Sequence, residues 1–532
     1  MLQRKYFECF ASVGRPIVPD RDLPYDVKSL LDDMRYARIH GAAVMHNAAK
    51  EFSFDFGNRA AMEQVADSSR LFPLAVVAST APAEMGNDAY FNDLLDGGMR
   101  GFVTLYKSSF CGLMTPKHME KMAEALVTHG RPLMLLNVNS EDQYAKVDVL
   151  AEAFPELQII MQGTNWASSR YFFDVMGQHE NVYFEMSSNH TNKILELTKK
   201  HFGIERALYS SMWPVKSMGA MKSMIEYADI SEAEKDLVAA GNACRLFGID
   251  VDSLELYDDA QCQWDEIARA ADAGEPIPVP VIDAHTHTVS GDYCGMVNNV
   301  MIDTDVDATV EKMDRLGVDM FLTAPWSGLG HNGIMANEEV LSMTKKYPGK
   351  VLGYSCANVN YAEDLEAVSQ YHEQHPDTFV GIKPYPPSQK RQLNEDVYKD
   401  WLNFANEHHL FALIHAEGPS GADQVDMICD NYPNVTFILA HSGASFYMAR
   451  YNSAIANRHP NVVLDITYTT TGRGMVEFLV DQVGADKVIY GSDMPMRDPS
   501  PQLGWVCYAK LSTEDKKKVL AENIQRLMDK RV

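Results

Sequence analysis

With 532 residues, the chain is too long for one ordinary domain and has the length of two units of about 250 residues each. Its 46% apolar and 23% charged residues are typical of a soluble globular protein with material for two cores. The net charge of −26 argues against nucleic acid and anionic membrane surfaces as partners, because both require a basic face. The net charge does not argue against a small-molecule substrate.

The N-terminal residues and the cysteines predict the compartment. Residues 1–10 lack the apolar core and cleavage site of a signal peptide, and no apolar run approaches the roughly 20 residues that cross a bilayer. The cysteines are scattered and form no C-x-x-C pair, which is typical of reduced thiols. We therefore expect a cytoplasmic protein. The eight cysteines are Cys9, Cys111, Cys244, Cys262, Cys294, Cys356, Cys429 and Cys507.

The first half of the chain repeats the second at an offset of 275 to 281 residues. ENVYFEMS at 180–187 corresponds to PNVVLDIT at 460–467, and NACRLF at 242–247 corresponds to NIQRLM at 523–528. A duplication with so long a period predicts two domains of one fold. The paired positions are Phe10 with His285, Gly101 with Gly381, Asn137 with His415, Gly163 with His441 and Met212 with Asp493.

The join between the two copies is predicted at residues 259–280. Asp259–Asp272 has a helix-like pattern and leads into AGEPIPVP, residues 273–280, whose prolines favour an extended connection. We expect this helix and linker to separate a first domain, residues 1–258, from a second, residues 281–532.

From residue 281, short apolar runs alternate with amphipathic helical stretches. Repeated strand–helix units predict parallel strands, and eight of them predict a closed (β/α)8 barrel. The runs are continuously apolar, as expected for strands buried on both faces. We therefore predict an α/β protein of two tandem (β/α)8 TIM barrels. The predicted strands are Val281–Ala284, Val318–Thr323, Val351–Cys356, Phe379–Lys383, Phe411–Ile414, Thr436–Ala440, Val462–Asp465 and Val488–Tyr490, and the helices include Asp307–Leu316, Glu395–Glu407 and Gly474–Val483.

Histidines, a lysine and an aspartate stand at the ends of five of these strands. His285 and His287 are two residues apart, so in a strand both imidazoles lie on one face, about 7 Å apart at the backbone and within reach of one ion. Each residue also has a structural explanation, as a hydrogen-bonded wall histidine, a helix N-cap or an exposed lysine. Active sites of (β/α)8 enzymes lie at the C-terminal strand ends, so the convergence favours a metal site. The residues are His285, His287, Lys383, His415, His441 and Asp493.

In this order the residues resemble the amidohydrolase superfamily of metal-dependent hydrolases. IDAHTH, AHSG and GSDMP are similar to its amidohydrolase-related branch, which also contains decarboxylases. The motifs cover Val281 to about Met528, and the likeness extends to Lys5–Phe247 in strand pattern only. The resemblance implies a divalent ion, most often zinc, with the ligands His285, His287, His415 and Asp493.

The resemblance also implies catalytic roles. His441 would act as a second-sphere base or electrostatic catalyst, and Asp493 can accept a proton besides binding the ion. Lys383 has two interpretations. In relatives with two metals a carboxylated lysine bridges them, whereas beside a single metal Lys383 faces the substrate. We favour one zinc ion.

The implied ligand set predicts the chemistry. Three imidazoles and one carboxylate leave the ion positive, so that it can lower the pKa of bound water from about 15.7 towards 7. Hydrolysis of a small amide, lactone or similar carbonyl is the favoured reaction. The alternatives are decarboxylation of a small carboxylic acid and, less favoured, a non-catalytic binding or scaffold protein. A homo-oligomer is compatible with the sequence. The basic residues Lys390, Arg391, Arg473 and Arg497 near the mouth indicate a substrate carboxylate.

The first copy lacks the ligand pattern. Only two of its corresponding residues are even weak metal ligands, so we expect a catalytically silent barrel, retained for packing or for shaping the partner site. The alternative is a metal-free site that uses Glu8, His46 or Asn137. The corresponding positions carry Phe10, Ser12, Val103, Asn137, Gly163 and Met212.

Overall fold

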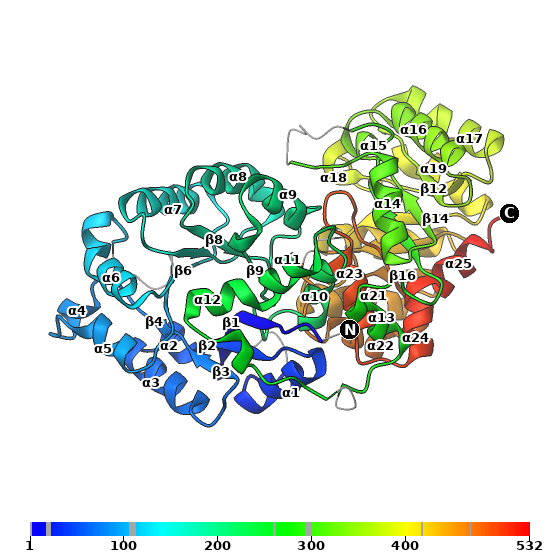
Figure 1. Ribbon diagram of the computed structural model, residues 1–532. Helices are drawn as coiled ribbons and strands as arrows, with labels where there is room; N and C mark the ends of the chain where they lie inside the picture. The colour runs from blue at the N-terminus through cyan, green and yellow to red at the C-terminus, as the bar shows by residue number, and fades with distance from the viewer. Residues whose placement is uncertain are drawn as a thin grey trace. The chain divides into compact units, whose positions relative to one another are not determined.

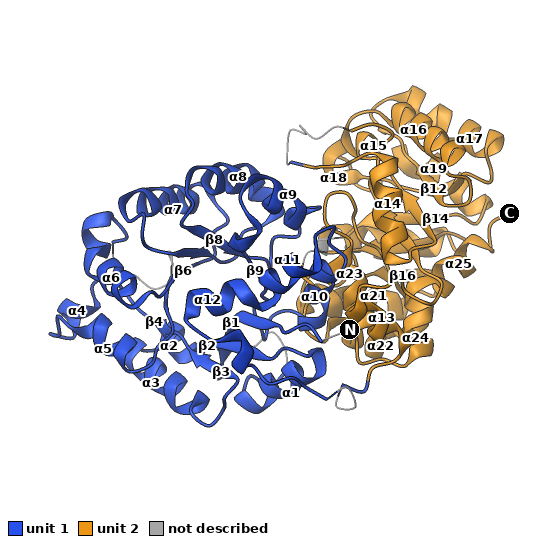
Figure 2. Ribbon diagram, viewed as in Figure 1, with its two compact units in different colours: residues 1–263, 297–300 blue, residues 264–296, 301–532 orange. Residues whose placement is uncertain are grey.

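The computed structural model describes residues 3–17, 23–105, 113–258, 262–292, 300–416, 419–468 and 470–532. The chain divides into two compact units (Figure 2), Met1–Gln263 with Val297–Val300 and Trp264–Met296 with Met301–Val532. Each unit has parallel strands surrounded by helices (Figure 1).

The strands of the first unit run parallel in the order β1-β2-β3 and β4-β5-β6-β7-β8-β9. Only Leu74 separates β3 from β4, and its amide donates to the Val44 carbonyl at 2.8 Å, so the two strands continue one another. The Cys9 amide donates to the Tyr209 carbonyl at 3.2 Å and joins β1 to the chain after β9, which closes the ring. The strands are β1 (Phe7–Val13), β2 (Gly41–His46), β3 (Leu71–Pro73), β4 (Ala75–Val76), β5 (Phe102–Leu105), β6 (Leu133–Leu136), β7 (Ile159–Met161), β8 (Val182–Glu185) and β9 (Ala207–Leu208).

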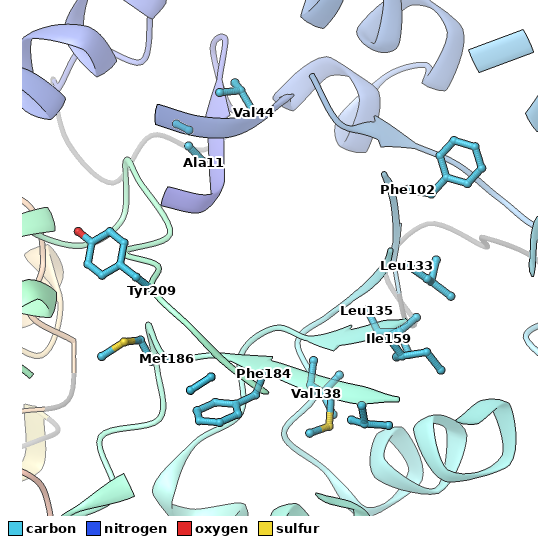
Figure 3. Packing of buried hydrophobic residues seen from close by; sticks show 14 of the residues in the cluster. Ala11, Val44, Phe102, Leu133, Leu135, Val138, Ile159, Phe184, Met186 and Tyr209 are labelled. Carbon is cyan, nitrogen blue, oxygen red and sulfur yellow. The ribbon is translucent and has the colours of Figure 1, made fainter. Parts of the chain in front are cut away.

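Alternate residues of these strands belong to two apolar layers. Leu133 and Leu135 of β6 pack in the cluster that includes the helices, and Figure 3 shows members of this cluster around the strands. Met134 and Leu136 belong to the second cluster, on the opposite strand face. Burial on both faces explains the continuous apolar runs. The helices are α1 (Val27–Ala37), α2 (Asn47–Glu51), α3 (Phe54–Val65), α4 (Ala81–Glu84), α5 (Tyr90–Asp96), α6 (Pro116–His129), α7 (Glu141–Ala153), α8 (Ser169–Gln178), α9 (Ile194–His201), α10 (Met218–Glu226), α11 (Glu232–Asp236) and α12 (Asn242–Phe247).

The second unit is a ring of parallel strands in the order β10 to β17. The Ala284 amide donates to the Tyr490 carbonyl at 3.1 Å, which closes the ring between β10 and the chain after β17. The predicted fold of two tandem (β/α)8 barrels is confirmed. The strands are β10 (Ile282–Thr286), β11 (Met320–Thr323), β12 (Val351–Ser355), β13 (Phe379–Ile382), β14 (Phe411–His415), β15 (Thr436–Ala440), β16 (Val462–Asp465) and β17 (Val488–Ile489).

The helix predicted over Asp259–Asp272 starts later than expected. The structure has α13 at Glu266–Ala273, because Gln263 adopts a left-handed φ of 52° and Asp265 caps the first turn. Residues 259–261 lie outside the described residues. The further helices are α14 (Val306–Leu316), α15 (Trp326–Gly330), α16 (Gly333–Lys346), α17 (Ala362–Gln374), α18 (Pro386–Gln389), α19 (Lys399–Glu407), α20 (Pro419–Ile428), α21 (Phe446–Arg458), α22 (Met475–Val483), α23 (Ser500–Cys507), α24 (Thr513–Lys517) and α25 (Asn523–Met528).

Each unit contains the same kind of buried contact at a matching position. Asn242 and Asn523 each donate the side-chain amide to two backbone carbonyls, at distances of 2.7 to 3.0 Å. In each unit this asparagine follows a π-helical turn, η3 (Leu237–Gly241) or η9 (Lys518–Glu522). Both copies therefore use one scaffold.

Among the described residues, no helix combines the length and the apolar character required to cross a membrane. The cysteines in this part of the chain are free and buried, while Cys111 and Cys294 fall outside it.

We expect Asn523→Ala to destabilise the second unit by about 1–3 kcal/mol, because two buried carbonyls lose their donor. Urea unfolding measures the change. The exposed neighbour Glu522 is the control, and Glu522→Ala should alter stability by less than about 0.5 kcal/mol. Equal stability of both variants would contradict the expectation.

Candidate metal centre

The strands of the second unit bring the predicted residues to one end of the barrel. His285 lies in β10, His287 follows that strand, and His415 ends β14. Lys383 follows β13, and His441 follows β15. Asp493 lies after β17, where its amide donates to the His285 carbonyl at 2.8 Å. All are at the C-terminal strand ends, where (β/α)8 enzymes have their active sites. His415 is partly buried and the others are buried.

Three of these residues form a compact ligand set. The Nε2 atoms of His285 and His287 lie 3.2 Å apart. Asp493 Oδ1 lies 3.1 Å from His287 Nε2 and 3.5 Å from His285 Nε2. Ligand atoms about 2 Å from one ion have separations in this range. His285, His287 and Asp493 could therefore hold a divalent ion without rearrangement of the barrel.

In three of the histidines, the Nδ1 atom donates a hydrogen bond to an acceptor within the barrel. His285 Nδ1 lies 2.7 Å from Asp465 Oδ2, His287 Nδ1 lies 2.8 Å from the Ala324 carbonyl, and His441 Nδ1 lies 2.9 Å from the Thr467 carbonyl. These acceptors carry no hydrogen, so Nδ1 donates in each case and Nε2 is the ring nitrogen left for a ligand in the mouth. Acceptors behind metal-bound histidines fix the ring in this way.

Burial and local charges place these groups in the protonation states that metal binding requires. Burial, with Lys383 nearby, lowers the pKa of His285 well below its usual value. Burial likewise lowers the pKa of His441 well below its usual value. Burial alone would raise the pKa of Asp493, but Arg497 and the neighbouring histidines hold it well below its usual range. His285 and His441 are therefore neutral and Asp493 is ionised.

His415 stands apart from the three-residue set. Its Nδ1 lies 3.2 Å from His441 Nε2, and the two ring centres are 4.8 Å apart. His441 also neighbours His285, with 5.2 Å between ring centres. The structure thus brings His415 to the same mouth beside His441. Its assignment as a fourth ligand stays a prediction.

Lys383 is a buried amine in the same mouth. Its Nζ has no hydrogen-bond partner within the described parts of the chain. Burial lowers the pKa of Lys383 to about 8, although Asp493 and Asp465 oppose the change. The Nζ lies 5.9 Å from the centre of the Tyr385 ring. Such an amine is suited to pair with an anionic group of a ligand.

Sequence reasoning missed the buried carboxylates under the site. Asp465 holds His285 and accepts from Thr467 N at 3.0 Å, and burial raises the pKa of Asp465 to about 6. Asp283 accepts from His285 N and Ser492 N, both at 3.1 Å, and burial raises the pKa of Asp283 to about 7. An acidic residue ending an apolar strand, in PNVVLDIT, was the signal available in the sequence.

The walls of the mouth are aromatic and include the buried Arg497. Trp326, Tyr385 and Tyr468 face His287, His415 and His441 respectively, with ring centres 5.3 to 5.9 Å apart. Arg497, predicted only as one of several basic residues near the mouth, donates to Asp493 Oδ2 and lies over the Tyr468 ring. The site therefore combines flat apolar walls with positive groups.

The first unit keeps the buried carboxylates but not the ligands. Glu8 accepts from Ser211 N at 2.9 and 2.8 Å, and Glu185 accepts from Gly163 N at 2.9 Å. At the ligand position, Met212 Sδ accepts from Gln162 Nε2 at 2.8 Å. Within the described ranges of this unit, no trio of histidine, cysteine or acidic side chains has metal-ligand spacing.

The alternative metal-free site of the first barrel has little support from these contacts. Both carboxylate oxygens of Glu8 are engaged by Ser210 and Ser211. His46 caps α2 through Ala48 N at 3.1 Å and contacts Gln64. Of the three residues, Glu8 and His46 are buried and Asn137 is exposed.

We expect Asp465→Asn to weaken metal affinity or turnover about 10- to 100-fold, because the charged acceptor behind His285 is lost. Metal titration and elemental analysis measure the effect. Glu185→Gln is the matched control in the first unit, where no histidine occupies the equivalent place, and it should leave metal binding unchanged. Equal metal affinity of both variants would show that Asp465 does not position His285.

The model of the amidohydrolase family matches residues 19–249 and 282–529. No match was found among curated proteins. Among solved structures, 5-carboxyvanillate decarboxylase from Novosphingobium aromaticivorans is 15% identical, with 47% of this chain and 96% of that chain covered and a TM-score of 0.39. 2,6-Dihydroxybenzoate decarboxylase from Rhizobium is 15% identical (47% and 99% covered, TM-score 0.36). 4-Oxalomesaconate hydratase from Rhodopseudomonas palustris is 16% identical (47% and 96% covered, TM-score 0.37).

The two matched ranges lie in the two barrels and together span most of the chain. The chain therefore belongs to the amidohydrolase family and is an enzyme of the amidohydrolase superfamily.

Proposed function

We propose that the second unit is a metal-dependent hydrolase acting on a small amide, lactone or similar carbonyl compound that carries a carboxylate. One observation supports this most directly: His285, His287 and Asp493 offer ligand atoms within 4.8 Å of one another. The donor set of two imidazoles and an ionised carboxylate fits one divalent ion, and we favour zinc.

The bound ion would supply a polarising positive charge and an activated water. The chain's own residues complete the chemistry. His441, with Nδ1 held by the Thr467 carbonyl, presents Nε2 as a proton acceptor towards the mouth. Asp493 keeps one oxygen on Arg497 and turns the other towards the histidines, so its position is fixed from both sides.

The substrate carboxylate is assigned to Lys383. A buried ammonium without a hydrogen-bond partner among the described residues is unfavourable until an anion pairs with it. The aromatic walls formed by Trp326, Tyr385 and Tyr468 suit a flat substrate body.

Decarboxylation of a small carboxylic acid is the second candidate. It is favoured by the ion pair between Arg497 and Asp493, because a carboxylate held in this way is a weak base for hydrolysis. A screen of lactones, amides and aromatic or unsaturated acids separates the two reactions. Release of carbon dioxide without hydrolysis of any lactone or amide would favour decarboxylation.

We place the protein in the cytoplasm, because the cysteines among the described residues are unpaired thiols. This location is tested by cell fractionation. Recovery of the protein from an oxidising compartment would contradict it.

We expect the double variant His285→Ala/His287→Ala to lose one metal equivalent per chain and all turnover, because two ligands of one ion are removed. Elemental analysis and the assay from the substrate screen measure both effects. Full metal content in the folded double variant would show that these histidines are not ligands.

We expect Lys383→Met to raise KM for carboxylate substrates at least tenfold and to stabilise the fold by about 1–3 kcal/mol, because a buried unpaired polar group is removed. Kinetics and urea unfolding measure these changes. Unchanged metal content fits one ion. Loss of one equivalent would instead support a carboxylated Lys383 that bridges two ions.

A further inference from the structure

His459, directly after α21, has both ring nitrogens on carboxylates outside the barrel mouth. Its Nε2 lies 2.8 Å from Asp426 Oδ1, and its Nδ1 lies 2.8 Å from Asp430 Oδ1. A neutral imidazole carries one N–H and a carboxylate carries none. Only one of the two contacts can therefore be a hydrogen bond of the neutral ring. The other requires a cation, either a second proton or a metal ion.

Asp426 identifies the contact that holds the ring hydrogen. Its Oδ2 accepts from Arg458 Nη2 at 2.7 Å, so Asp426 is fixed as an ionised acceptor for His459 Nε2. A carboxylate behind one ring nitrogen leaves the other as an electron-pair donor, which is the arrangement found behind metal-bound histidines. The cation is thus required at His459 Nδ1, facing Asp430.

Cys429 adds a sulfur ligand at this point. One potential ligand atom from each of Cys429, Asp430 and His459 lies within 4.8 Å of the other two. We propose that these three residues form a second divalent-metal site, between α20 and α21 of the second barrel, that takes a zinc-like ion. Sulfur, imidazole and carboxylate are the ligands zinc accepts, and the 78% exposed Asp430 side chain leaves room for water as fourth ligand.

The backbone on both sides of this site is anchored. Asn461 Nδ2 donates to the Cys429 carbonyl at 3.1 Å, and Lys487 Nζ donates to the His459 carbonyl at 2.9 Å. Ligands held by such contacts are positioned before the ion binds. Burial, with Asp430 and Asp426 nearby, raises the pKa of the Cys429 thiol to about 11. Ion binding must therefore displace the thiol proton.

The first unit provides an internal comparison. There His179 Nε2 lies 2.7 Å from Asp148, which corresponds to the contact between His459 and Asp426. Asn181 donates to the Ala151 carbonyl at 3.3 Å. Ala151 thus occupies the place of Cys429. The histidine–aspartate pair and its asparagine anchor belong to the shared scaffold, whereas the sulfur is an addition of the second unit.

Cobalt substitution tests the site in the full chain. The protein is stripped with a chelator and reloaded with Co²⁺, which gives a near-ultraviolet charge-transfer band when a thiolate binds it. The ligands assigned to the centre at the barrel mouth include no sulfur, so loss of the band in Cys429→Ala assigns it to this thiol. We expect the band in the wild type and its loss in Cys429→Ala, together with one metal equivalent. Cys507→Ala, which removes another buried thiol, should keep both.

Two further variants complete the test. Asp430→Asn, at an exposed position, should keep the fold and weaken Co²⁺ binding at this site at least tenfold. His285→Ala/His287→Ala should keep the thiolate band, which separates this proposal from the proposed function. A fully loaded wild type without the band, as expected if only a proton bridges His459 and Asp430, overturns the proposal. The proposal is also overturned if the band persists in Cys429→Ala or is lost in the histidine double variant.

Discussion

The hydrogen bond between His285 and Asp465 is the interaction on which the candidate centre depends. It joins β10 to β16 inside the second barrel and connects residues that are 180 positions apart. Both groups are fully buried, so an unpaired partner would be strongly unfavourable. The same bond turns the His285 lone pair towards His287 and Asp493. This one hydrogen bond therefore affects both the stability of the second barrel and the geometry of the candidate ligands.

The two barrels show which parts of this arrangement belong to the scaffold. Glu8 and Glu185 stand where Asp283 and Asp465 stand in the second unit. Glu8, like Asp283, accepts from backbone amides. Glu185 accepts from the Gly163 amide, whereas Asp465 holds the His285 ring. The first unit has these buried carboxylates without the ligand set, and removing them would leave buried donors unpaired. The Met212 thioether stands at the position of Asp493, and a thioether is not among the usual ligands of zinc.

The same contrast applies on the outside of the barrel. The pair of His459 and Asp426 has a counterpart in the first unit, but the neighbouring thiol does not. A histidine held by a carboxylate occurs at this place in both copies, and the second copy adds a thiol beside it. The two candidate metal sites of the second unit thus differ from the first unit in a few side chains placed on contacts that both copies contain.

The sequence by itself determined the two barrels and the residues at the mouth. Continuous apolar runs identified the strands, and the parallel topology requires His285, Lys383, His415 and Asp493 to meet at one end. The start of α13 could not be predicted, because the left-handed backbone of Gln263 leaves no signal in a helical pattern. Only the tertiary structure decided that Asp493 approaches His285 and His287 while His415 lies against His441. Those distances depend on strand register and on buried acceptors such as Asp465, which come from distant parts of the chain and meet only when the barrel closes.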